Sequence, residues 1–344
     1  MKMHEARLYE PLDGGKIRCR LCAHTCVIAP GKRGICGVRE NHEGRLYTLV
    51  YGKLVAANAD PIEKKPLFHF QPGSRSFSIA TAGCNFRCRF CQNWEISQLP
   101  RHDPGALATS GPETTPAQVV EAAAASGCRS ISYTYTEPTV FFEFAADTMS
   151  LAHSRGLKNV FVTNGYQSPE CLEALEGLLD GANVDLKAMS DEFYRHECGA
   201  KLAPVLSTLK AMKAMGLWVE VTTLLIPGRN DDPAQLSELA GFIATELGRD
   251  VPWHVSAYTP RYEYSRTGPP PTSVETLEQA AEIGRAQGLE FVYLGNVPGH
   301  GWENTYCPGC GRLLIERRGF YIISNDLEAG RCPGCHRAIA GVWE

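Results

Sequence analysis

Between residues 77 and 294, short apolar segments alternate with longer amphipathic ones. The apolar segments have the length and composition of buried strands, and the others have the length and periodicity of helices. The predicted strands are 77–83, 130–134, 159–163, 182–186, 217–225, 253–258 and 289–294, and the predicted helices are 116–127, 139–156, 169–181, 206–216, 233–247 and 273–287. Such alternation is typical of a parallel sheet with crossover helices, so we predict an α/β fold whose seven strands form an incomplete barrel.

Two Cys-rich parts flank this alternation. The N-terminal part contains a predicted hairpin at 41–51 and then a connector at 60–73, whose prolines and glycine argue against regular structure. We expect the connector to be a packed linker, although its charged and aromatic side chains could also line a substrate cleft. The predicted domains are 1–72 for the N-terminal segment and connector, 73–300 for the barrel and 301–344 for a C-terminal module.

The overall composition narrows the class of protein. The 344 residues are 44% hydrophobic, which suits a globular protein with a real core. The net charge of -4 gives no argument for nucleic acid or an anionic membrane, and no apolar run approaches the roughly 20 residues of a membrane span. The first residues lack the apolar stretch of a signal peptide. The fourteen cysteines, mostly in tight clusters, indicate metal ligands in a reducing cytoplasm rather than a disulfide framework.

A three-cysteine motif, Cys84-x3-Cys88-x2-Cys91, follows the first predicted barrel strand directly. Three thiolates on a [4Fe-4S] cluster leave one iron open, and that iron can hold a small molecule and transfer an electron to it. The loop after a barrel strand is also where such folds keep their active sites. A structural zinc site and three unrelated buried thiols are the alternatives, and the motifs farther along the chain favour the cluster.

This motif, with the aromatic Phe90 before its last cysteine, resembles the radical S-adenosylmethionine (SAM) superfamily. The segment Gln92-Asn93-Trp94 is similar to the one after the motif in pyruvate formate-lyase activating enzymes. The resemblance implies a partial (β/α)6 barrel and a [4Fe-4S] cluster on the three cysteines, whose unique iron chelates the amino and carboxylate groups of SAM. It also implies that the reduced cluster cleaves SAM to methionine and a 5′-deoxyadenosyl radical.

The ends of the next two strands resemble the same superfamily. Glu137 and Pro138 match a Gly-Gly-Glu-Pro-like motif that holds the SAM amino group, whereas Tyr135 and Thr136 replace its glycines. A hydroxyl could therefore take over as the hydrogen-bond acceptor. The next strand ends in Thr163-Asn164-Gly165, similar to glycyl radical enzyme activases, with Val162 where those often carry an aspartate.

The pair Asp185-x-Lys187 resembles the activases again, and its two side chains point the same way from a strand. We expect Lys187 to pair with the methionine carboxylate and Asp185 to accept from the ribose hydroxyls or the amino group. The alternative is a surface ion pair worth about 0.5 kcal/mol. His254, in the sixth strand, is a further candidate, and His300 in the glycine-rich exit from the last strand is a weaker one. The expected SAM contacts are Phe90, Asn93, Thr134, Thr136, Glu137, Thr163, Asn164, Asp185, Lys187 and His254.

The N-terminal cysteines Cys19, Cys22, Cys26 and Cys36 have the close spacing of a metal site, with His24 between them. Zinc accepts four thiolates in a closed tetrahedron, and a second iron–sulfur cluster accepts the same ligands. His24 could replace one cysteine, and a set of reduced thiols without metal is the third alternative. Four thiolates alone do not discriminate between the metals.

The tail carries two Cys-Pro-Gly-Cys knuckles, Cys307 to Cys310 and Cys332 to Cys335, around predicted strands at 313–316 and 320–323. Two such knuckles supply four tetrahedral ligands, so we predict a zinc ribbon or a rubredoxin-like module, with zinc as the expected metal. The strands' apolar side chains should pack against the barrel; they are Leu313, Ile315, Tyr321 and Ile323. The remaining cysteines are interpreted as core or helix-face thiols; they are Cys128, Cys171 and Cys198.

Taken together, the motifs resemble the AmmeMemoRadiSam-system radical SAM enzymes, through Gly34 to Arg39, Asp60 to Pro66, the central motif, Tyr133 to Pro138 and the tail. The resemblance implies an activase-like enzyme whose radical abstracts hydrogen from a protein or small molecule. It also implies a flavodoxin- or ferredoxin-type reductant and a partner encoded nearby. The alternative is a non-catalytic metalloprotein, a scaffold or metal carrier. The cluster cysteines together with Asp185 and Lys187 favour catalysis.

Overall fold

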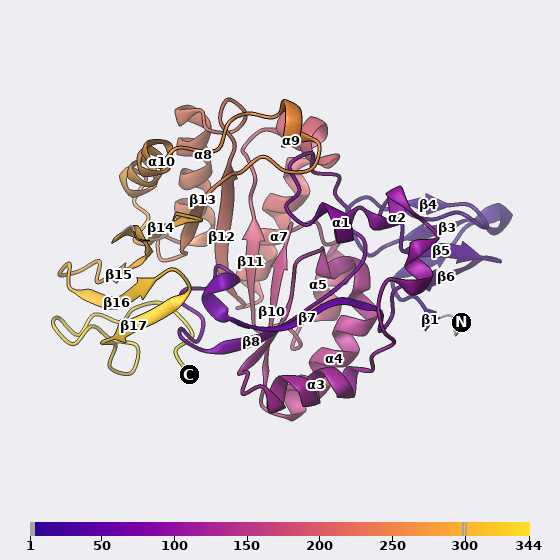
Figure 1. The fold of residues 1–344 in the computed structure, drawn as a ribbon, viewed down its shortest axis with the longest axis horizontal. Helices are drawn as coiled ribbons and strands as arrows, with labels where there is room; N and C mark the ends of the chain where they lie inside the picture. The colour runs from indigo at the N-terminus through magenta and orange to yellow at the C-terminus, as the bar shows by residue number, and fades with distance from the viewer. Residues whose placement is uncertain (1–3, 298, 300) are drawn as a thin grey trace.

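The computed structural model describes residues 4–297, 299 and 301–344, and its centre is one eight-stranded sheet (Figure 1). The strands, from one edge to the other, are β14 (Val292–Gly295), β13 (Trp253–Ala257), β12 (Trp218–Leu225), β11 (Gly181–Asp185), β10 (Lys158–Thr163), β9 (Ser130–Tyr133), β8 (Arg75–Thr81) and β7 (Leu54–Pro61). The seven strands from β8 to β14 are parallel and lie in chain order. The predicted incomplete parallel barrel is therefore confirmed. The antiparallel edge strand β7, which pairs with β8, was not predicted.

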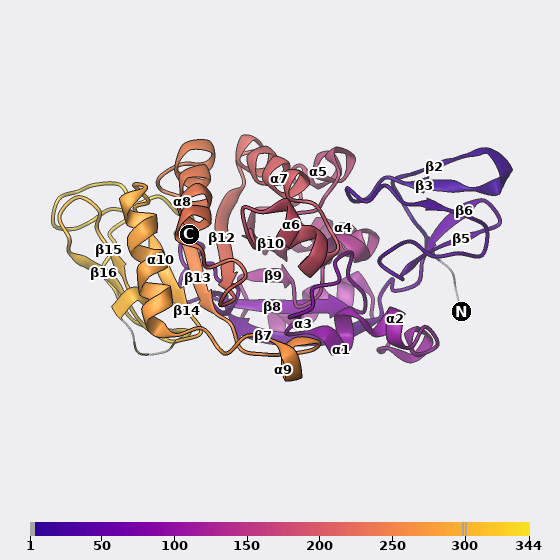
Figure 2. The ribbon, with the colours of Figure 1, turned by 90° about the horizontal axis from the view of Figure 1, so that it is seen from above.

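Helices connect the successive parallel strands. They are α3 (Pro116–Ala125), α4 (Phe142–Ser154), α5 (Pro169–Leu175), α7 (Leu202–Ala214), α8 (Pro233–Phe242) and α10 (Val274–Ala286), with short helices α1 (Trp94–Ser97), α2 (Leu99–His102), α6 (Asp191–Phe193) and α9 (Tyr264–Thr267) in the loops. Helices α5, α7, α8 and α10 lie along one side of the sheet (Figure 2). Thr115 caps the start of α3, because its hydroxyl accepts from the Gln118 amide at 3.3 Å.

The N-terminal segment forms two small antiparallel sheets at one end of the molecule (Figure 1). One contains β1 (His4–Glu5), β6 (Arg45–Thr48) and β5 (Arg39–His42), and the other contains β2 (Tyr9–Pro11), β3 (Ile17–Cys19) and β4 (Val27–Ile28). The predicted hairpin is present as β5 and β6. The apolar core of the barrel continues into this segment through Ile17, Leu21 and Val38. The segment is therefore packed against the barrel and is not a separate domain.

The C-terminal module lies at the opposite end and consists of β15 (Thr305–Tyr306), β16 (Leu313–Arg318) and β17 (Tyr321–Asn325) (Figure 1). Ile315 is fully buried against a separate apolar cluster that includes Phe68 of the connector. The prediction that Tyr321 and Ile323 also pack inward is wrong, since they are 71% and 58% exposed. Side chains alternate along a strand, and Ile322 is the residue of β17 that contacts the cluster.

No helix in the described ranges is long and apolar enough to cross a lipid bilayer.

Candidate active site

A cavity of about 510 Å³ opens at the carboxyl ends of the parallel strands. Its size is in the usual range for small-molecule and cofactor sites, and its position is where barrel folds place them. The cavity brings together all but one of the residues that were predicted to contact SAM. These are Phe90, Asn93, Thr134, Thr136, Glu137, Thr163, Asn164, Asp185 and Lys187.

The three cysteines of the central motif also line this cavity, and the main chain around them is held in place. The Arg101 guanidinium donates to the Cys84 carbonyl at 2.9 Å, and the Arg87 amide donates to the Cys198 carbonyl at 2.8 Å. Such bonds fix the loop before any ligand arrives. Cys198 also donates a thiol hydrogen bond to Cys88 and thereby lowers the pKa of Cys88, although burial opposes this shift.

Three thiolates at the edge of one cavity are the ligand set of an iron–sulfur cluster that leaves one iron open. Among the described residues, the compact group of ligand atoms that suits a single metal ion lies in the tail.

Glu137 joins the ends of β9 and β10. Its carboxylate accepts from the Asn164 amide at 2.8 Å, the Thr163 hydroxyl at 2.8 Å and the Thr139 amide at 3.1 Å. Burial raises the pKa of Glu137, and these hydrogen bonds oppose the shift. The side chain is 2% exposed, so its main action is to fix the two loops that face the cavity.

Tyr135 takes the backbone conformation expected of the glycine that it replaces. Its φ is 63°, in the left-handed region that glycine adopts most readily. The Tyr135 carbonyl accepts from the Asn93 side chain at 2.8 Å, which ties this turn to the cysteine loop. The Thr136 hydroxyl donates to the Thr81 carbonyl at 2.9 Å and keeps its lone pairs for another donor.

Asp185 and Lys187 form an ion pair inside the cavity, with Lys187 Nζ 2.8 Å from Asp185 Oδ2. Burial lowers the pKa of Lys187, but Asp185 and the Cys88 thiolate outweigh burial and raise the pKa well above its usual range. Lys187 therefore carries a positive charge close to the cysteine loop. Two nearby oxygens, Asn183 Oδ1 and Thr222 Oγ1, are buried in the cavity wall and have no hydrogen-bond partner in the described part of the chain. Buried polar atoms of this kind are suited to receive a ligand.

His254 is the predicted SAM contact that the structure does not bring to the cavity. It is the second residue of β13, deep in the barrel, where its Nε2 lies 2.6 Å from Glu220 Oε2. Ser256, two residues farther along the same strand, lines the cavity instead. Barrel sites are built at the carboxyl ends of the strands, and His254 lies too early in its strand to reach there. His300 lies outside the described residues.

The connector contributes a polar group that the sequence prediction treated as part of a packed linker. Asp60 accepts from Lys65 at 2.7 Å, from Lys64 at 3.0 Å and from the Tyr135 hydroxyl at 2.5 Å. Burial lowers the pKa of Lys65 to about 8, and Asp60 partly offsets this effect. Lys64, Lys65 and Phe320 of the C-terminal module line the cavity together. The alternative expectation for the connector, that its charged side chains line a cleft, therefore holds for Lys64 and Lys65. Phe320 had no such expectation, because it comes from a module far away in the sequence.

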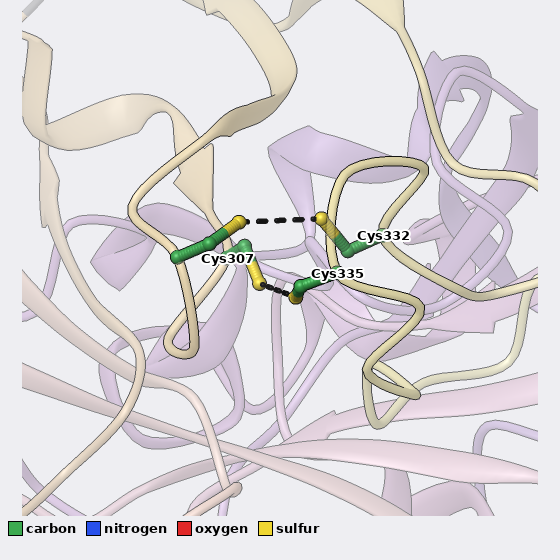
Figure 3. Close-up of side chains that lie close together, drawn as sticks. Cys307, Cys332 and Cys335 are labelled. Atoms are coloured by element: carbon green, nitrogen blue, oxygen red, sulfur yellow. Dashed lines mark hydrogen bonds between the residues drawn. The ribbon is translucent and has the colours of Figure 1, made fainter.

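The tail cysteines converge as a closed four-thiol site (Figure 3). The sulfurs of Cys307 and Cys335 lie 3.5 Å apart, and those of Cys310 and Cys332 lie 3.6 Å apart. All four sulfurs lie within 4.8 Å of one another, close to the spacing around one tetrahedral ion. The Gly309 amide donates to the Cys307 sulfur at 3.4 Å, as the knuckle geometry predicts. This group can hold a metal ion.

The chain is similar to several known proteins. The family model described as "Radical SAM superfamily" matches residues 78–240. An uncharacterized protein of Methanocaldococcus jannaschii is 49% identical over 339 residues, which cover 98% of this chain and 99% of that protein. A pyruvate formate-lyase-activating enzyme of Listeria monocytogenes is 25% identical over 190 residues, covering 51% of this chain and 71% of the enzyme. A crystal structure of a domain of pyruvate-formate lyase-activating enzyme from Bacteroides vulgatus, 18% identical, covers 48% of this chain and 99% of that domain with a TM-score of 0.43.

Proposed function

We propose, from the premise that this chain belongs to the radical SAM superfamily, that it is an activase-like enzyme. In this proposal Cys84, Cys88 and Cys91 hold a [4Fe-4S] cluster, and SAM binds beside it in the 510 Å³ cavity. When both are bound and the cluster is reduced, they supply a 5′-deoxyadenosyl radical that abstracts hydrogen from a substrate. The observation that carries the proposal is the meeting of the three cysteines with the partly buried Asp185–Lys187 ion pair in one cavity.

Different residues of the cavity would bind different groups of SAM. Lys187 is positively charged and mostly buried, which suits the methionine carboxylate. Asp185, 36% exposed, can accept from the ribose hydroxyls or the amino group. The unpartnered oxygens of Asn183 and Thr222 offer two further acceptors. Phe90, 2% exposed, supplies apolar surface that excludes water near the cysteine loop.

The substrate would enter on the side of the cavity bounded by Lys64, Lys65 and Phe320. The proposed substrate is a protein residue or a small molecule, as in the activases that the chain resembles. An electron must reach the cluster before SAM can be cleaved, so we also propose a flavodoxin- or ferredoxin-type reductant. An oxygen-sensitive cluster and free thiols suit a reducing cytoplasm.

The tail is proposed to bind one zinc ion through Cys307, Cys310, Cys332 and Cys335. The site is closed, with four thiolates and no open position, which suits a structural ion rather than chemistry. It would keep the module folded at the rim of the cavity, where it presents Phe320.

The proposal is tested by reconstituting the protein anaerobically and adding SAM with a strong reductant. The full chain should form 5′-deoxyadenosine and methionine. A Cys88→Ala variant should form neither, because the cluster loses a ligand. Cys128→Ala is the matched control, since Cys128 lies outside the cavity, and it should retain the activity. If the iron-loaded chain forms no 5′-deoxyadenosine, the enzyme proposal fails and the metal-carrier alternative stands.

A further inference from the structure

Two groups of reactive side chains lie outside the proposed SAM contacts. One is the set of N-terminal cysteines, where the expected metal stays a prediction; they line an enclosed cavity of about 20 Å³ and are Cys19, Cys22, Cys26 and Cys36. The other group lies at the 510 Å³ cavity and consists of Asp60, Lys64, Lys65 and Tyr135. We call this second group the lysine cluster.

The lysine cluster carries a net positive charge. Lys65 Nζ lies 2.7 Å from Asp60 Oδ2, and Lys64 Nζ lies 3.0 Å from Asp60 Oδ1. Burial raises the pKa of Asp60, but hydrogen bonds from Lys65, Tyr135 and Lys64 outweigh burial and hold this pKa well below its usual range. Burial lowers the pKa of Lys65 only to about 8, so its ammonium is mostly protonated at neutral pH. Two ammonium groups therefore share one carboxylate, and one positive charge is left over.

The ammonium group of Lys65 has donors to spare. It carries three N–H groups, and Asp60 is its one hydrogen-bonding partner among the residues that the structure describes. The ring of Tyr135 covers another side, with its centroid 4.5 Å from Lys65 Nζ. The Lys65 side chain is 2% exposed, yet it lines the cavity. An acceptor for the remaining N–H groups would therefore come from a molecule in the cavity.

Tyr135 indicates that the lysine cluster is a built site. Its φ of 63° is a conformation that residues other than glycine seldom adopt, and such strain persists mainly at functional sites. The side chain gives this strain a purpose, because its hydroxyl donates to Asp60 and its ring faces Lys65. The Tyr135 carbonyl accepts from the Asn93 side chain at 2.8 Å. Tyr135 thus joins the lysine cluster to the cysteine loop.

The connector that carries the two lysines is anchored to the barrel. The Asn183 side chain donates to the Pro66 carbonyl at 2.7 Å. The amides of Phe68 and His69 donate to the buried Glu220 carboxylate at 3.0 and 2.8 Å. These bonds hold the lysines at the cavity before any ligand arrives, which is the preorganisation that a binding site needs.

The other charged side chains that line the cavity are already engaged. Asp185 and Lys187 pair with each other and are assigned to SAM in the proposed function. The Glu137 carboxylate accepts hydrogen bonds from its own loop and from the end of β10. The positive charge of the lysine cluster is then available to a second ligand.

We propose that the lysine cluster binds an anionic group of the substrate, a carboxylate or a phosphate, and that the substrate is a small anionic molecule. The anion accepts from the spare N–H groups of Lys65 and Lys64. The inference rests on the proposed function, in which SAM fills the part of the cavity next to the cysteines, and it names the class of substrate. A backbone glycine of a protein substrate is neutral and would make no use of this charge.

The test is calorimetric titration of the anaerobically reconstituted full chain with inorganic phosphate and, separately, with succinate. The cluster is kept oxidised and SAM is saturating, so that SAM stays intact and Lys187 is occupied. We expect saturable binding of about one anion per chain, and the tighter of the two probes identifies the anionic group. Lys65→Met should weaken this binding about ten- to a hundredfold, because a charge-assisted hydrogen bond is lost. Lys64→Met should cause a smaller loss of about three- to tenfold, since Lys64 is 43% exposed.

Lys210→Met is the matched control, because it removes the same charge from a surface pair and should leave anion binding unchanged. The proposal is overturned if neither anion binds saturably, or if Lys65→Met binds it as tightly as the unaltered chain. If Lys65→Met does not fold, Lys64→Met decides, and a loss below twofold in that variant contradicts the proposal. SAM binding is measured on the same samples. A chain that binds SAM but neither anion contradicts this inference alone, whereas a chain that binds an anion through Lys65 but no SAM contradicts the proposed function.

Discussion

Lys187→Ala is the change that most directly probes how SAM is held. Lys187 Nζ lies 2.8 Å from Asp185 Oδ2, and the Lys187 side chain is 12% exposed, so the ammonium is largely out of solvent. A charge-assisted hydrogen bond to the SAM carboxylate is worth about 1.5–3 kcal/mol. Since about 1.4 kcal/mol corresponds to a factor of ten, we expect SAM affinity to fall roughly ten- to 150-fold.

The loss of Lys187 also leaves Asp185 without its ion-pair partner. An unpaired carboxylate would repel the SAM carboxylate and add to the loss. Asp185→Asn separates the two effects, because it removes this charge and leaves Lys187 in place. The double variant should lose less affinity than the sum of the two single losses, since the residues are in contact.

The assay is equilibrium binding of SAM to anaerobically reconstituted protein, with iron measured in every sample. Lys210→Ala is the matched control, because Lys210 is 52% exposed and pairs with Glu246 on the surface. It should leave SAM affinity unchanged. An affinity for Lys187→Ala within a factor of two of the unaltered chain, at equal iron content, would refute the assigned role.

Three other variants and conditions give further expectations. Cys332→Ser should remove about one equivalent of zinc and make residues 306–344 sensitive to protease while the iron stays, because a module this small depends on its metal to fold; unchanged zinc would contradict the tail site. Burial lowers the pKa of His69 to about 4 in the folded chain, whereas its usual pKa of about 6.5 applies in the unfolded chain. Between these two pH values the unfolded chain is protonated at His69 and the folded chain is not. Denaturant midpoints should therefore fall as the pH drops from about 6.5 to about 4, and His69→Gln should flatten this slope. Glu137→Gln should lower the free energy of unfolding by about 1–3 kcal/mol, because the carboxylate accepts hydrogen bonds from Asn164 and Thr163; chemical denaturation measures it, and a change below 0.5 kcal/mol would refute this reasoning.

Much of the barrel could be predicted because its signals are local. The short apolar segments became β8 to β14, and Asp185, the last residue of β11, lies in one cavity with Lys187, which follows the strand. The sequence could not show how far along a strand a residue lies from the barrel mouth. His254 is therefore deep in the barrel beside Glu220, while Ser256 reaches the cavity.

Residues brought together by tertiary packing escaped prediction. Phe320 belongs to the C-terminal module, yet it borders the cavity beside Lys65 of the connector, for which cleft lining was only the less favoured expectation. Cys198 forms a side-chain hydrogen bond with Cys88, although 110 positions separate the two residues in the sequence. The inward face of β17 was also misassigned, because the alternation around Ile322 is equally consistent with either register until the neighbouring strand is known. These contacts join residues that are far apart in the sequence, so a local sequence pattern does not predict them.

The most direct test of the central claim is the electron paramagnetic resonance spectrum of the reduced cluster with and without SAM. The claim is that Cys84, Cys88 and Cys91 leave one iron open and that SAM occupies it. The measurement uses the anaerobically reconstituted full chain. We predict that SAM shifts this spectrum and that Cys88→Ala abolishes the SAM-dependent shift. A spectrum of the intact three-cysteine cluster that stays the same at saturating SAM would contradict the claim.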